Sequence, residues 1–106
     1  MKTHNKLVRD KIPQIIESNN EHCKTRILDT AEYIKELNIK LQEELNEYLN
    51  STTDTEAIEE LADLEEVLRA VLDAKGVSYD KFEQIRLKKV EKRGAFKDRI
   101  YLESTF

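Results

Sequence analysis

Two pairs of carboxylates stand at helical spacing in the middle of the chain. Glu44 and Glu47 are three residues apart, and Glu60 and Asp63 repeat that interval after a gap of twelve residues. Side chains three apart on a helix lie on one face, about one turn from each other. Oxygen ligands grouped in this way suit hard cations, Mg²⁺ or Mn²⁺, better than zinc. The sequence therefore predicts a divalent metal site made from both pairs.

Two predicted helices position these acids. Asp29 opens a helix over residues 30–50 and Thr53 opens another over 54–75, each followed three residues later by the glutamate of a capping box. The short connection, residues 51–53, makes the two helices antiparallel neighbours. Both acidic pairs lie near the connected ends, so they can face each other.

An ordinary solvated helix surface is the alternative reading of these acids. The helix over 54–75 weakens that alternative, because Glu60 and Asp63 head a stripe that continues as Val67, Ala70 and Ala74. This helix is apolar on two sides, and we expect its acidic pair to be covered by protein. On the preceding helix the predicted core stripe is Ile34, Leu37, Leu41, Leu45 and Tyr48.

The remaining chain is also predicted to be helical. A short helix is expected over residues 10–19 and a capped one over 79–93, with the last dozen residues extended over the bundle. Only two glycines and one proline are present, which favours helix over sheet. The fold class is thus all-α, a single domain over residues 1–106 folded as a four-helix bundle and completed by dimerisation.

Charge is divided along the chain. Residues 29–66 carry thirteen acidic and two basic side chains, whereas residues 86–99 carry seven basic and two acidic ones. Lys89 and Arg93 share a helical side with Phe82 and are predicted to project toward the bundle. They could bind phosphate oxygens beside the metal site, or they could pair with the acidic helices.

Composition excludes several classes of protein. The single cysteine cannot form an internal disulfide, and no stretch approaches the roughly 20 apolar residues that span a bilayer, so we expect a cytoplasmic protein without a membrane partner. His4 and His22 occupy no position typical of a di-iron helical site. A net charge of −4 argues against nucleic-acid binding through the basic segment.

The chain resembles the all-α nucleoside triphosphate pyrophosphohydrolases, the MazG-like superfamily, which also includes phosphoribosyl-ATP pyrophosphohydrolase and the dimeric dUTPases. The resemblance covers nearly the whole chain, and its opening segment 6–13 and closing segment 93–96 look like those of a small single-domain branch. The motifs that carry it are Glu44-x-x-Glu47, Glu60-x-x-Asp63 and Lys89-x-x-x-Arg93.

This resemblance implies an enzyme. It would hydrolyse a nucleoside triphosphate, or a related nucleotide such as phosphoribosyl-ATP, between the α- and β-phosphates, to cleanse the nucleotide pool. The four acids would hold Mg²⁺, for which Mn²⁺ can substitute, and Glu44 or Glu43 would activate the attacking water. Lys89 and Arg93 would bind phosphate. Arg9 and Lys11 are further phosphate candidates, unless they pair with acids. The resemblance also implies a homodimer or homotetramer.

A second hypothesis is that the protein catalyses no reaction. The same helices could form a non-catalytic interaction or regulatory module that uses its apolar stripe to bind a partner protein. Under that hypothesis the acids are dispensable, and a charge placed at Val67 disrupts assembly.

Overall fold

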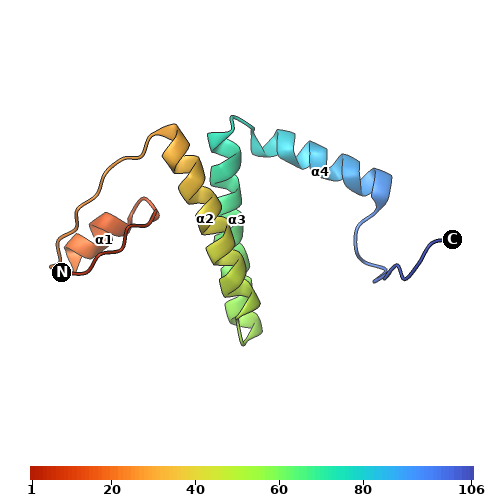
Figure 1. The fold of residues 1–106 in the computed structure, drawn as a ribbon, viewed down its shortest axis with the longest axis horizontal. Coiled ribbons are helices and arrows are strands. Elements are labelled where there is room, and N and C mark those ends of the chain that lie inside the picture. The colour runs from red at the N-terminus through yellow and green to blue at the C-terminus, as the bar shows by residue number, and fades with distance from the viewer.

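The computed structural model of the chain describes residues 1–106 and is entirely helical (Figure 1). Four helices follow in order, α1 (Ile12–Ser18), α2 (Thr30–Leu49), α3 (Asp54–Ala74) and α4 (Tyr79–Arg93). The predicted all-α class and the four helices are confirmed, and α1 is shorter than the predicted 10–19. None of the helices combines the length and the apolar character needed to cross a membrane.

The three longer helices begin at the predicted caps. The side chains of Asp29, Thr53 and Ser78 each accept a hydrogen bond from the backbone N–H three residues further on, at 2.9, 3.2 and 3.1 Å. Each bond satisfies an N–H that has no partner inside its helix. Local sequence therefore sets where α2, α3 and α4 start.

Only α2 and α3 pack along their lengths, as an antiparallel hairpin from which the chain on either side departs (Figure 1). Leu37, 3% exposed, is the single fully buried apolar side chain, while Leu45 of the predicted core stripe remains 38% exposed. Two helices can bury only their facing stripes. The predicted four-helix bundle is therefore wrong for one chain, because α1 and α4 do not join the hairpin.

The molecule is far more extended than a compact domain of its size. Its radius of gyration is 18.3 Å, against about 13 Å for a compact chain of this length. Its accessible surface is 9935 Å², whereas a folded monomer of 12.5 kDa exposes about 6,200 Å². Each chain thus presents about 3,700 Å² more surface than a self-contained domain would.

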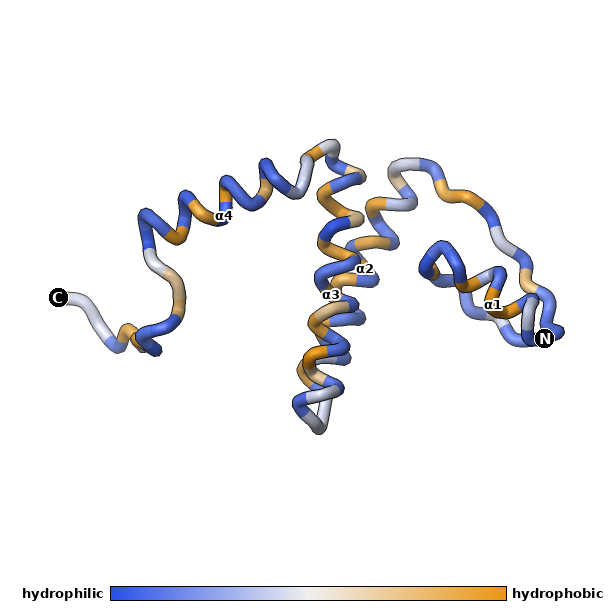
Figure 2. Tube along the Cα trace, turned by 180° about the vertical axis from the view of Figure 1, so that it is seen from behind, coloured by the Kyte–Doolittle hydropathy of each residue, from blue (hydrophilic) through white to orange (hydrophobic).

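The C-terminal segment, residues 94–106, contains no helix or strand and lies at the far end of α4 from the hairpin (Figure 1). Phe96 is 98% exposed and Tyr101 is 87% exposed, and the hydropathy tube marks apolar stretches along this segment (Figure 2). The sequence predicts that the last dozen residues run extended over the bundle. They are extended, but the hairpin is not beneath them.

Candidate functional site

Three of the four predicted metal ligands meet across the hairpin. Carboxylate oxygens of Glu44 and Glu47 on α2, and of Glu60 on α3, all lie within 4.8 Å of one another. The antiparallel pairing accounts for this meeting, because Glu44 and Glu60 lie at comparable distances from the connection between α2 and α3, and Glu47 is one turn from Glu44. Grouped carboxylates of this kind match the oxygen donor set of a hard divalent cation.

Glu44 is the most perturbed group of the cluster. Its side chain is buried, with 9% of the residue exposed, and its Oε2 atom has no hydrogen-bond partner. Burial raises the pKa of Glu44 to about 7, with repulsion from Glu47 as the next cause and a smaller contribution from Asp63. A buried carboxylate oxygen without a partner is costly, so the residues present fit a cation at this position.

Glu60 shares the same environment on α3. A hydrogen bond with Glu47 raises the pKa of Glu60, and burial of the carboxyl group adds to that shift. Its Oε2 atom is also buried without a partner. Carboxylates from both helices therefore compete for protons in one place, and a divalent ion would relieve that competition.

The fourth predicted ligand has another partner. Arg9 Nη2 donates to Asp63 Oδ1 at 2.6 Å, from the segment that precedes α1. The sequence left open whether Arg9 binds phosphate or pairs with an acid of the second predicted helix. It pairs with an acid, although that acid belongs to α3. Both side chains are largely exposed, so this pair contributes at most about 1 kcal/mol to stability.

Glu43 and Lys11 lie outside the acidic cluster. Glu43 Oε1 forms an ion pair with Lys40 Nζ at 3.6 Å. Lys40 lies one turn earlier on the same helix. Lys11 immediately precedes α1, where its side chain is exposed and caps no backbone group. Neither residue contacts Glu44 or Glu60 through a hydrogen bond or ion pair, and the structure does not group them with the predicted ligands.

Lys89 and Arg93 do not project toward the acids. Both are exposed on α4, which leaves the hairpin at the end opposite the α2–α3 connection (Figure 1). The acidic cluster lies near that connection. The predicted junction of metal site and phosphate-binding side chains is therefore absent within one chain.

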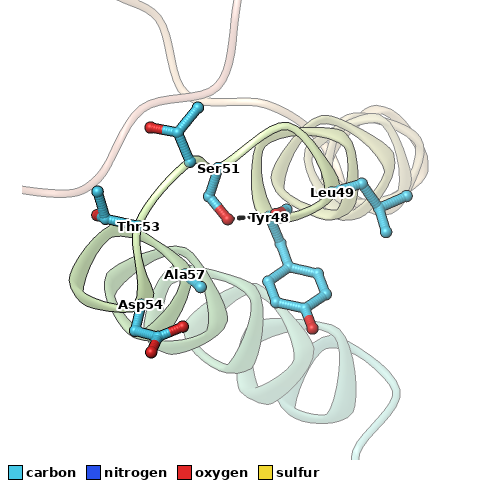
Figure 3. A pocket seen from close by; sticks show the side chains of 7 residues that line it. Tyr48, Leu49, Ser51, Thr53, Asp54 and Ala57 are labelled. Atoms are coloured by element: carbon cyan, nitrogen blue, oxygen red, sulfur yellow. Dashed lines mark hydrogen bonds between the residues drawn. The ribbon is translucent and has the colours of Figure 1, made fainter.

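A shallow hollow of about 250 Å³ lies at the connection itself (Figure 3). Its lining comes from the last turn of α2, the connection and the first turn of α3, and Ser51 Oγ donates to the backbone oxygen of Tyr48 at 2.6 Å. None of the predicted site residues lines it. The hollow is open, and we assign it no ligand.

Fold and site together define an open, all-α protein with an acidic cluster and large exposed apolar surfaces, a class suited to binding other proteins. The sequence model of the NleF caspase inhibitor family matches residues 20–100, well over half of the chain. The chain belongs to the NleF caspase inhibitor family. It matches no curated protein and no solved structure.

The family match contradicts the predicted enzyme. A caspase inhibitor acts on a protein, so the MazG-like resemblance, the nucleotide substrate and the pyrophosphohydrolase activity are wrong. The spacing of the acids pointed to the wrong family because carboxylates three residues apart recur on many charged helices. The catalytic roles of Glu44 and Glu43, and the phosphate-binding roles, depended on that enzyme and lapse with it.

Sequence reasoning missed that the C-terminal segment leaves large apolar side chains exposed. The available signal was a run of large apolar residues that no predicted helix needed for its core. These residues are Phe96, Ile100, Tyr101, Leu102 and Phe106.

Proposed function

We propose that this protein is a non-catalytic inhibitor that binds a caspase. The observation that carries the proposal is the family match over residues 20–100. The open fold supports it, because exposed apolar surface marks sites of protein contact. Caspases are cysteine proteases, so a protein bound over the substrate path lowers their activity without any reaction of its own.

The C-terminal segment is the surface we propose for the target. It presents Phe96, Ile100 and Tyr101 almost fully to solvent. Aromatic side chains in particular are enriched among the residues that dominate binding energy in protein interfaces. An extended segment also leaves its backbone groups free to pair with a strand edge of another protein.

Caspase activity on a fluorogenic peptide tests this proposal. We expect the wild-type chain to lower the cleavage rate in a saturable manner. The double variant Ile100→Asp with Tyr101→Asp should restore the rate. Lys88→Glu, which changes the net charge by the same amount at an exposed position of α4 outside the C-terminal segment, should inhibit like wild type. Full caspase activity at saturating wild-type protein would refute the proposed function.

We also propose that the folded form contains a second copy of the chain. A chain of this size with one buried apolar residue lacks a core of its own. The excess surface of about 3,700 Å² per chain is more than a standard protein interface requires, and it suits a permanent one. Sedimentation of the purified protein measures the assembly directly.

A third part of the proposal concerns the acidic cluster. We propose that Glu44, Glu47 and Glu60 bind one divalent cation, with Mg²⁺ as the probe and Mn²⁺ as a substitute. The unpartnered Oε2 atoms of Glu44 and Glu60 support it. When bound, the ion would neutralise the cluster and stabilise the α2–α3 hairpin.

Thermal unfolding with Mg²⁺ alone tests the cation site. Ligand that binds only the folded state raises the midpoint as its concentration rises. We expect the midpoint of wild type to rise and that of Glu60→Gln to stay constant. Glu43→Gln, a neighbouring acid outside the cluster, is the matched control and should respond like wild type. Equal responses of wild type and Glu60→Gln would refute the site.

A further inference from the structure

The two flanks of α2 differ completely in charge. Along one flank, residues at helical spacing are Asn38, Gln42, Leu45 and Leu49, and none is charged. Along the other, at the same spacing, they are Glu36, Lys40, Glu43 and Glu47, and all are charged. Since 38% of the chain is charged, an uncharged flank needs a reason.

This uncharged flank is concave and open. A groove of about 230 Å³ runs along it, lined by Asn38, Leu41, Gln42, Leu45 and, from α3, Leu64. None of these five side chains carries a charge. Residues spaced four, three and four apart lie on one side of a helix, which is the spacing by which one helix packs on another, and here they are two amides and two leucines. The groove therefore has the chemistry of a helix-packing surface that has no helix on it in a single chain.

The apolar surface continues beyond the groove onto both helices. Leu49 is 67% exposed, and on α3 Ile58 is 66% and Leu61 is 43% exposed. The antiparallel pairing around the connection brings Ile58 level with Leu45. Large aliphatic side chains on both helices of the hairpin thus remain open to water near the connected end.

The size of the exposed surface identifies the partner. An isolated chain buries too little to fold stably, so whatever covers this flank must be present whenever the chain is folded. Another copy of the chain meets that condition, and a target protein encountered later does not. The uncharged flank of α2 also places no charge against itself when two copies meet, which suits a two-fold symmetric interface.

We infer that two copies pack the Asn38–Gln42–Leu45–Leu49 flanks of their hairpins together, with α2 and α3 of both chains forming a four-helix core. This inference rests on the proposed self-association and names the surface that makes it. The acidic cluster stays on the other flank, and the C-terminal segments stay free for a target. The interface, the cation site and the target surface are thus separate parts of one chain.

Thiol protection tests the named surface with conservative changes. In a Cys23→Ser background, Leu49→Cys and Ile39→Cys each supply one thiol on α2, at positions 67% and 52% exposed in the single chain. If the protein were a single chain, the thiols at positions 49 and 39 would both be modified fast. We expect Cys at position 49 to react more slowly than at position 39, and to lose this protection on dilution.

Association of charged variants provides the second measurement. Leu45→Asp should lower the assembled fraction in sedimentation, whereas Ile39→Asp, which adds the same charge to α2 away from the flank, should not. An assembled protein whose thiol at position 49 stays fully reactive would overturn the surface and leave self-association standing. A fully helical monomer would overturn both. Neither result depends on a caspase or a cation.

Discussion

Replacing Glu44 by glutamine should stabilise the protein at neutral and higher pH. The pKa of Glu44 is raised to about 7 in the folded state from an ordinary value of 4.5. The folded state therefore binds a proton more tightly than the unfolded state does. Stability that depends on this group is present below pH 4.5 and is lost as pH rises through about 7.

The size of the effect follows from the shift. A change of one pKa unit corresponds to about 1.36 kcal/mol, so the charged form of Glu44 costs at most about 3 kcal/mol of folding free energy. Burial of the carboxyl group is the largest part of this cost, repulsion from Glu47 on α2 and Asp63 on α3 adds to it, and the charge of Lys40 on α2 reduces it. Because glutamine keeps the shape and removes the charge, Glu44→Gln should gain up to about 3 kcal/mol at pH 8 and nothing near pH 4.

Urea unfolding measured across pH 4 to 8 gives this difference, at one protein concentration and with chelator to remove divalent ions. Glu43→Gln, whose ion pair with Lys40 lies outside the cluster, is the control and should show no comparable gain at high pH. A Glu44→Gln protein as stable as wild type at pH 8, or less stable, would refute the assignment of a buried and repelled carboxylate.

Four further outcomes are expected. Leu37→Ala, which truncates the one fully buried apolar side chain, should lower the unfolding free energy by about 3 kcal/mol in urea titration, and an effect below about 1 kcal/mol would contradict its core position. Ser78→Ala removes the cap of α4 and should cost about 1 kcal/mol by the same assay, with helix loss detectable by circular dichroism. Arg9→Ala breaks an exposed ion pair and should change stability by less than about 1 kcal/mol at 0.15 M salt, so a larger loss would mean that Asp63 is more enclosed than the structure has it. Incubation with nucleoside triphosphates and Mg²⁺ should release no pyrophosphate, and release by wild type but not by Glu60→Gln would reinstate the enzyme.

Local features of the fold were predictable from the sequence. Helix starts depend on a side chain and a backbone N–H three residues away, so Asp29, Thr53 and Ser78 identified them from spacing alone. The meeting of Glu44 with Glu60 followed from two helical periods and a short connection. These are short-range constraints, and the chain satisfies them regardless of its partners.

Long-range features were not predictable in the same way. Whether α4 folds back on α3 depends on the conformation of the residues between them and not on the pattern of either helix. Helical spacing groups Asp63 with the predicted ligands, because spacing does not reveal that Arg9, 54 residues away, donates a hydrogen bond to it. The prediction of function was wrong for a related reason. The acidic pattern fits several classes of protein, and the family match was needed to choose among them.

The junction of α3 and α4 has a consequence for where the proposed target surface lies. The guanidinium of Arg69 lies 3.8 Å from the ring centre of Tyr79, which ties the first turn of α4 to α3. From that fixed point a helix of 15 residues reaches about 22 Å outward before the C-terminal segment begins. In the proposed pair of copies, two such arms would each present one of the proposed target surfaces, so one assembly would engage two target sites at once and gain avidity.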